Sequence, residues 1–468
     1  ENHVDPKVVD APDIEQEIVK TTQVVKVHVD DLLKKFSVLT QAQSPDFQTI
    51  KALKEQKKNQ RYTALAKRFS PSVAAEISQE RMINGYQDDD STLSANSSGE
   101  DIPYTDGDSL TDWTIDLDLP LYRRSVNVQN ALAGLDYDLA VINYDIAVKE
   151  MEIKLRELLG NYILASYNLL NLENSINISS DHVAQIQRGY DLRDQTRLAL
   201  LRSQANLEML KGRKEANEQR KDQALRELLD YTAMKQDDPL LIRLDQMVAD
   251  EQQIVDLVDC FSLADEINGD IRPLIEMAAD DALRDVFLEK SPLARKIRME
   301  QESARARASQ YTQEEFPELA VRGELMRKED TPFEEMEGEG TVGLVLKVPV
   351  FSGGTLYSNA MTEEQARRVA AIQGESALRR QFNSLANKRK TIQSLLNIYE
   401  IQQRHLAEQQ EIVRLSLKSY QIKQTSMQEL LDSNNALIDA KSSFMQTRIT
   451  LNNLILQFAW ETGSPLSF

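Results

Sequence analysis

Two carboxylates in the last tenth of the chain are the residues whose types and spacing could do chemistry. Glu429 and Asp432 stand three positions apart, and residues at i and i+3 share one face of a helix. Facing a narrow aqueous passage, such a pair would attract cations and repel anions. For an arbitrary acidic pair a solvated helix face is the safer interpretation. The choice between this interpretation and a channel-facing pair depends on the helices and strands that position the two residues.

The residue inventory does not predict an enzyme. His3, His28, His182 and His405 have no HxxxH or HxxE spacing, and Cys260 is the single cysteine. One cysteine excludes an internal disulfide and a cysteine-based metal site. The sequence has neither a phosphate-cradling glycine loop nor a nucleophile elbow. We therefore predict no catalytic residue, no metal ligand and no cofactor.

Composition restricts the classes of partner that the protein can bind and the type of structure with which it could cross a membrane. The net charge of −20 argues against nucleic acid, whose binding surfaces are basic. Both a solvated acidic surface and a water-filled lumen lined by carboxylates would fit this charge. No segment approaches the ~18 consecutive apolar residues of a spanning helix. If the chain crosses a bilayer, a closed β-barrel must do it.

The chain is an internal repeat. Ser44-Pro45 and Ser291-Pro292 each open a polar helical stretch, followed by two strand-like segments and a long helical run. Further on, residues 200–207 align with residues 430–437, and the spacing between these landmarks is nearly constant. The predicted segments are an N-terminal segment at 1–43, repeat 1 at 44–232, a small mixed domain at 233–290, repeat 2 at 291–461 and a C-terminal tail at 462–468.

Each repeat carries two strands whose pattern suits a bilayer. In Trp113–Leu119 apolar and polar residues alternate strictly, so opposite faces of the strand differ in polarity. Half-buried hairpins of a soluble domain alternate in the same way. A membrane is favoured by the length of about ten residues and by Trp113, Tyr122 and Phe351, which lie where interfacial aromatic belts occur. The predicted strands are about 72–84, 110–121, 317–327 and 341–351.

Four strands cannot close a barrel, because the smallest membrane barrels have about eight. Strands that lie in lipid must leave no open edge, so a membrane location requires several chains. Three chains would supply twelve strands.

The helical runs are too long for a globular domain. Proline is absent from Arg123 to Tyr190 and from Thr355 to Tyr420, and each run would be ~100 Å long. Turns at about 190–196 and 420–426 precede shorter return helices. Such helices need a coiled-coil-like assembly. A soluble periplasmic coiled-coil scaffold or adaptor protein is the competing interpretation.

Four motifs stand in fixed order in the second half of the chain: Val348–Gly354, Ser419–Asp432, Asn435–Lys441 and Trp460–Gly463. With the duplication, they make the whole chain resemble the TolC-type outer-membrane efflux and secretion channels. The resemblance implies an α+β membrane protein that forms a homotrimer. A twelve-stranded β-barrel in the outer membrane would continue into a long periplasmic α-helical barrel, with a mixed equatorial domain built from residues 1–43 and 233–290.

The resemblance also implies the function and the partners. The channel would be a passive exit duct, surrounded by outer-membrane lipid and extending into the periplasm. It would serve a tripartite efflux pump or a type I secretion system. Its partners would be a periplasmic adaptor (membrane fusion) protein and an inner-membrane pump or ABC transporter.

By the same resemblance, Glu429 and Asp432 face the channel axis at the narrow periplasmic end and form a ring of carboxylates in the trimer. The corresponding positions of repeat 1, Ala199 and Arg202, lack acids. Any constriction would therefore belong to repeat 2. The residues expected to support this gate are Tyr420, Thr425, Arg193 and Arg197.

The helix tips depart from the family pattern. Members often carry glycine there, where the adaptor docks, whereas this chain has Arg193 and Lys423. The acidic segment 86–108 is expected to be a solvated extracellular loop. The tip residues expected to contact the adaptor are Asp191, Arg193, Asp194, Ile422, Lys423 and Gln424.

Overall fold

The computed structural model describes residues 33–81, 109–261, 271–277, 280–328, 337–350, 353–422 and 424–464. These residues form two compact units, and each unit draws on both repeats. Unit 1 consists of the described parts of Glu1–Ala52, Ile142–Lys296 and Ala377–Phe468, and unit 2 of those of Leu53–Val141 and Ile297–Ser376. The predictions for residues 1–32 and for the acidic loop 86–108 lie outside the described residues.

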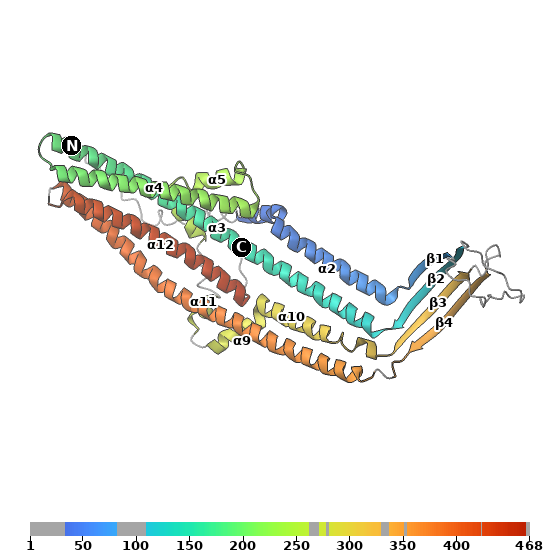
Figure 1. Cartoon of the computed structure of the whole chain (residues 1–468). Coiled ribbons are helices and arrows are strands. Elements are labelled where there is room, and N and C mark those ends of the chain that lie inside the picture. The colour runs from blue at the N-terminus through green and yellow to red at the C-terminus, as the bar shows by residue number, and fades with distance from the viewer. Residues whose placement is uncertain are drawn as a thin grey trace, which may run out of the picture. The chain divides into compact units, whose positions relative to one another are not determined.

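Two very long helices dominate the chain (Figure 1). Helix α3 (Arg124–Asp191) has 68 residues and α11 (Thr355–Gln421) has 67, which at 1.5 Å per residue is ~100 Å each. The return helices α4 (Arg197–Thr232) and α12 (Met427–Thr462) have 36 residues each. The prediction of long helices is confirmed.

The remaining helical elements are shorter, and four of them fall in the segment between the repeats. They are the helical residues 33–43, α2 (Pro45–Phe69), α5 (Pro239–Met247), α6 (Glu251–Phe261), α8 (Arg272–Glu276), α9 (Asp280–Lys290), α10 (Pro292–Ala308) and the 3-10 turn η2 (Gln313–Glu315).

Unit 1 has two main hydrophobic clusters, one for each helical hairpin. The first cluster packs α5 and α6 against α3 and α4, through fully buried side chains such as Leu159, Leu228 and Leu257. The second packs α8 and α9 against α11 and α12, through Phe287 and Leu385 among others. The segment 233–290 is thus divided between the two hairpins, because its short amphipathic helices bury their apolar faces on different long helices.

Unit 2 contains one antiparallel sheet in the order β1-β2-β3-β4. Its strands are β1 (Ser72–Arg81), β2 (Ser109–Tyr122), β3 (Glu318–Lys328) and β4 (Glu337–Lys347). The prediction of four strands is confirmed, but the bounds of β4 differ from the predicted 341–351. This strand begins four residues earlier and ends at Lys347, since Pro349 has no N–H to donate to a ladder.

The register places nearly all apolar side chains on one face of the sheet. Val73 lies opposite Leu117, Ile115 opposite Leu325, and Val321 opposite Leu344. The other face is charged: Asp118 lies opposite Arg322, and Asp116 opposite Glu324. The apolar face is solvent-exposed on the outer strands, with Ile77 on β1 76% and Val342 on β4 78% accessible, and half-buried along β2.

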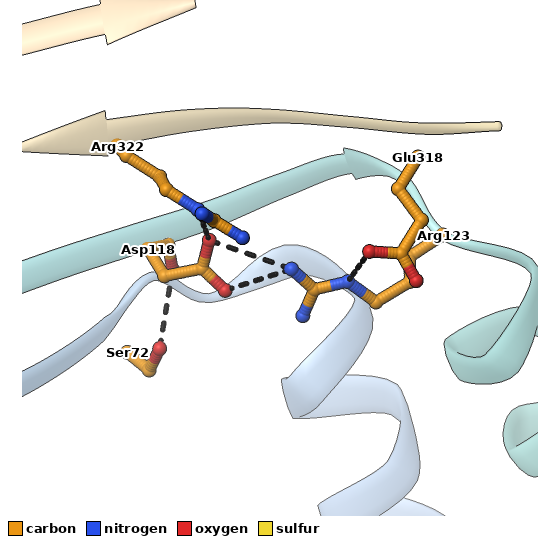
Figure 2. Close-up of polar contacts among 5 residues, drawn as sticks. All are labelled: Ser72, Asp118, Arg123, Glu318 and Arg322. Atoms are coloured by element: carbon orange, nitrogen blue, oxygen red, sulfur yellow. Dashed lines mark hydrogen bonds and ion pairs between the residues drawn. The ribbon is translucent and has the colours of Figure 1, made fainter. Parts of the chain in front are cut away.

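A charged cluster holds the junction where β2 leads into α3 (Figure 2). Asp118 Oδ2 lies 3.1 Å from Arg123 Nη2, and Arg123 Nε lies 3.5 Å from Glu318 Oε2 on β3. Arg322 approaches the second oxygen of Asp118 at 3.5 Å, and Ser72 on β1 donates a hydrogen bond to the Asp118 backbone oxygen. Arg123 therefore ties the start of α3 to both β2 and β3.

The junction in repeat 2 is built differently. Gly353 and Gly354 have φ of 61° and 89°, a region that glycine enters without steric cost. The pair breaks the chain direction between Val350 and α11.

Candidate functional site

The candidate site lies in unit 1, at the two turns that join the long helices to their return helices. In the first turn α3 ends at Asp191, and Arg193 adopts a left-handed conformation with φ of 69°. Asp194 N and Gln195 N both donate to Gly189 O, at 2.7 and 3.1 Å. A left-handed conformation costs a non-glycine residue about 1 kcal/mol, so this turn closes with local strain.

The second turn has an equivalent backbone bond and additional side-chain bonds. Thr425 Oγ1 donates to Ser416 O at 3.4 Å, and Ser426 caps the first turn of α12. Gln424 N completes the turn with a 2.8 Å bond to Ser419 O. Lys423 lies outside the described residues.

Glu429 takes part in a capping box. Its backbone N donates to Ser426 Oγ at 3.3 Å, while its carboxylate accepts from Ser426 N at 3.2 Å. The pattern Ser-x-x-Glu at residues 426–429 is the sequence signature of this motif. Glu429 therefore stabilises the helix start whatever else its charge does.

Asp432 lies one turn further along α12. It is exposed, and its Oδ1 accepts a hydrogen bond from Gln428 Nε2 at 2.9 Å. Glu429 is also exposed, so both carboxylates of the pair meet solvent within one chain. The i, i+3 spacing keeps them on the same side of α12.

The four predicted gate supports behave differently from one another. Tyr420 packs edge-on against His182 of α3, with ring centroids 6.2 Å apart, and burial raises the pKa of the Tyr420 phenol. Burial likewise lowers the pKa of His182, against the opposing effects of Asp181 and Gln185. Arg193 and Arg197 are exposed and form no ion pair with the described residues.

A groove between the two hairpins is the feature that the sequence did not indicate. It has a volume of about 690 Å³. Turn and return-helix residues of both repeats line it, including Asp194, Leu198, Arg202, Tyr420, Gln428 and Leu431. Because the lining comes from positions 230 residues apart, only the packing of the hairpins creates it.

The tip residues expected to contact a partner are on the surface where they are described. Asp191, Asp194 and Gln424 are exposed, and Ile422 is 65% accessible. Leu192, which the sequence analysis did not single out, is 76% accessible.

The predicted interfacial aromatics are only partly described. Trp113 lies on the apolar face, between Ile77 and Arg327 on the neighbouring strands, and is half-buried. Tyr122, at the end of β2 after an irregularity in the pairing with β3, is exposed. Phe351 lies outside the described residues.

Across the described ranges, no helix is both long and apolar enough to span a membrane. The same ranges contain no grouping of three or more histidine, cysteine, aspartate or glutamate side chains suited to a metal ion.

Comparison with known proteins identifies the architecture. No family model and no curated protein matches the sequence. Among solved structures, the CmeC outer membrane channel of Campylobacter jejuni superposes with a TM-score of 0.72 at 14% identity, over 93% of this chain and 86% of that one. The chain has the fold of the TolC-type outer-membrane channels.

Two further structures agree. CusC, studied for folding and transmembrane channel formation, gives a TM-score of 0.72 at 14% identity over 93% of this chain and 92% of that one. VceC, an outer membrane protein of Vibrio cholerae, gives 0.67 at 11% identity over 92% and 96%. The resemblance inferred from the sequence is thus confirmed for the fold, across nearly the whole length of a TolC-type chain.

Proposed function

We propose that this chain is one subunit of a homotrimeric outer-membrane exit duct, a passive channel that extends into the periplasm. The two-faced sheet of unit 2 is the observation that carries the proposal. Its apolar face is exposed on the outer strands β1 and β4 and half-buried along β2, whereas its other face carries Glu76, Asp116, Asp118 and Glu324. Such a sheet is suited to hydrocarbon on one side and water on the other.

The open edges of the sheet support the trimer. The outer edges of β1 and β4 have no partner strand among the described residues. An unpaired edge in lipid would cost several kcal/mol for each backbone group. Three copies joined β1 to β4 would give twelve strands and leave no edge.

The long helices support the same assembly. Ile398, Ile401, Ile412 and Leu415 are exposed along α11, at two positions of a seven-residue repeat that is interrupted by His405 and Glu408. Such a stripe is the seam of a coiled coil. A second copy of the chain would bury it, and the helices would then form the predicted periplasmic α-helical barrel.

The channel delivers substrate that an energised partner supplies. A periplasmic adaptor and an inner-membrane pump or ABC transporter would complete a tripartite efflux pump or a type I secretion system. The neighbours of the same fold are described as outer membrane channels, which supports the membrane and the duct. The chain itself performs no catalysis in this proposal.

We place the gate at Glu429 and Asp432, with Tyr420, Thr425, Arg193 and Arg197 as supports. In the trimer, three copies of the pair would gather around one axis, where water is confined and charge is poorly screened. Tyr420 would hold α11 against α3 through His182 while the channel is closed.

Extraction behaviour tests the duct against a soluble scaffold. A barrel-forming trimer needs detergent, resists dissociation and opens ion-conducting pores in planar bilayers. A soluble scaffold would account for the long helices. It would not explain why apolar side chains of the sheet are exposed to solvent. A protein that stays soluble and monodisperse without detergent would contradict the proposal.

Ion selectivity tests the gate. We expect the double variant Glu429→Gln, Asp432→Asn to lower the cation-over-anion permeability ratio in planar bilayers by about threefold or more, because it removes the fixed negative charge. Glutamine and asparagine retain the capping-box and Gln428 hydrogen bonds, so the tip stays folded. Glu208→Gln, an exposed acid on α4, is the control. An unchanged permeability ratio in the double variant would remove the gate assignment.

A further inference from the structure

A cation stands on the apolar face of the sheet. On β3 this face presents Leu319, Val321 and Leu325, and Arg327 follows in the same alternation. The Arg327 side chain is exposed. A charge on a face that is suited to lipid costs free energy unless it lies near the headgroups or meets an anion. The position of Arg327 along the strand therefore matters.

Arg327 lies at the end of the sheet away from the helices. β1 follows α2 and β2 leads into α3, so the helices join the sheet at the end that carries Leu319. Arg327 is eight positions further along β3, which is ~27 Å along the strand. Strands of a membrane barrel are tilted by about 40°, so the two residues would differ in depth by ~20 Å. Arg327 would then lie near the edge of an apolar band that is about 25 Å tall.

The neighbours of Arg327 are aromatic on one side and small on the other. Trp113 on β2 lies directly opposite Arg327 and is half-buried. On the other side, β4 places Gly338 opposite Arg327 and Gly340 opposite Leu325. Glycine has no side chain that could cover the guanidinium. The guanidinium can therefore be reached from outside the apolar face, with an indole ring beside it.

The acidic side chains of the neighbouring rows belong to the other face of the sheet. Glu324 lies opposite Asp116, and Glu339 lies opposite Met326. These positions alternate with that of Arg327, and successive side chains of a strand point to opposite faces. An anion that approaches Arg327 across the apolar face therefore meets the cation without a carboxylate of the described strands beside it.

We infer that Arg327 and Trp113 bind the phosphate group of an outer-leaflet lipid on the membrane side of the sheet. This inference rests on the proposed function, which places the helices in the periplasm and hence Arg327 in the outer leaflet. It adds the headgroup chemistry of the lipid. A guanidinium binds phosphate through two parallel hydrogen bonds. A tryptophan ring at the interface packs on apolar lipid groups, while its N–H can meet the headgroups.

The surface that continues from the site favours a lipid over a free phosphate ion. Leu325 is 45% accessible and Val342 is 78% accessible on the same face. Acyl chains attached to the bound phosphate would cover these side chains, whereas an isolated ion would leave them in water. The site thus combines a headgroup contact with an apolar contact.

The test uses the full-length protein in detergent and two lipids that differ only in phosphate. Lipid A with both phosphates is compared with lipid A from which a phosphatase has removed them, so the acyl chains are the same. EDTA is present throughout, because a divalent cation could otherwise bridge the lipid phosphate to a carboxylate. We expect the phosphorylated lipid to bind about tenfold more tightly, as one charge-assisted contact allows. Displacement of a fluorescent lipid measures both affinities.

Variants decide the role of Arg327. Arg327→Gln should abolish the tenfold preference, and Arg327→Lys should keep part of it, because lysine has the charge without the planar fork. Binding of the dephosphorylated lipid should persist in both variants, which shows that the apolar face is intact. Lys347→Gln removes an exposed cation from the charged face of β4 and should leave the preference unchanged.

Three results would overturn the inference. They are equal binding of the two lipids, a preference that survives Arg327→Gln, and displacement of the lipid by inorganic phosphate as effectively as by lipid A at the same concentration. The last result would indicate a site for a free anion instead of a lipid.

Conductance in planar bilayers, measured on the same preparation, separates the two proposals. A conducting protein that binds both lipids equally removes only the lipid inference. A protein that prefers the phosphorylated lipid through Arg327 but never conducts removes only the exit duct.

Discussion

The two helical hairpins of unit 1 share a scaffold but differ at their tips. Their return helices have the same length, and each begins after a Ser or Thr N-cap. Both turns share an equivalent backbone bond, to Gly189 O and to Ser419 O, but only the second has a capping box, which includes Glu429. Asp432 adds a second acid where the first hairpin has Arg202. Duplication has therefore kept the packing and changed the chemistry at the apex.

The largest expected effect tests whether the two hairpins are anchored equally. Leu159 and Leu385 are fully buried in the first and second hydrophobic clusters. We expect Leu159→Ala and Leu385→Ala each to lower the free energy of unfolding by about 2–5 kcal/mol, through lost burial and a cavity. Thermal and denaturant unfolding followed by circular dichroism measure the loss. Leu53→Ala, at a half-exposed position, is the control, and a loss in only one hairpin would show that the anchoring is unequal.

The helix caps give a smaller effect. Ser426→Ala and Thr196→Ala each remove one side-chain hydrogen bond and should each cost about 1 kcal/mol. The double variant Ser426→Ala, Glu429→Ala also removes the bond from Ser426 N to the Glu429 carboxylate and should cost up to about 2 kcal/mol. Hydrogen exchange at the backbone amides of residues 197–200 and 427–430 reports these costs. Equal exchange rates in Ser426→Ala and the double variant would show that the reciprocal bond adds nothing.

The smallest effect has the opposite sign. Arg193→Gly should raise the free energy of unfolding by about 1 kcal/mol, because glycine adopts a left-handed conformation without the Cβ clash. Arg197→Gly, in the first turn of α4 where φ is helical, should lower it by up to about 1 kcal/mol. The unfolding midpoints of these two variants measure the contrast. A loss of stability in Arg193→Gly would mean that the arginine side chain supports the turn after all.

Local patterns predicted much of the fold. The alternation in Trp113–Leu119 and the absence of proline from the long runs predict strands and helices, because both signals act within a few residues. The first and last residues of a strand are harder to predict from the sequence. The bounds of β4 depend on which residues of β3 pair with it and on Pro349, which cannot donate a backbone hydrogen bond. The Ser426–Glu429 pattern indicated the capping box, but our sequence analysis interpreted Glu429 only as a gate residue.

The sequence by itself determined the duplication, the long helices and the chemical character of each strand face. Only the tertiary structure decided which faces meet. It set Asp116 opposite Glu324, joined Arg123 to β3, opened the groove between the hairpins and turned Arg193 into a strained conformation. The physical reason is that periodicity is a local property, whereas strand register, grooves and positive φ arise from packing among segments far apart in the chain.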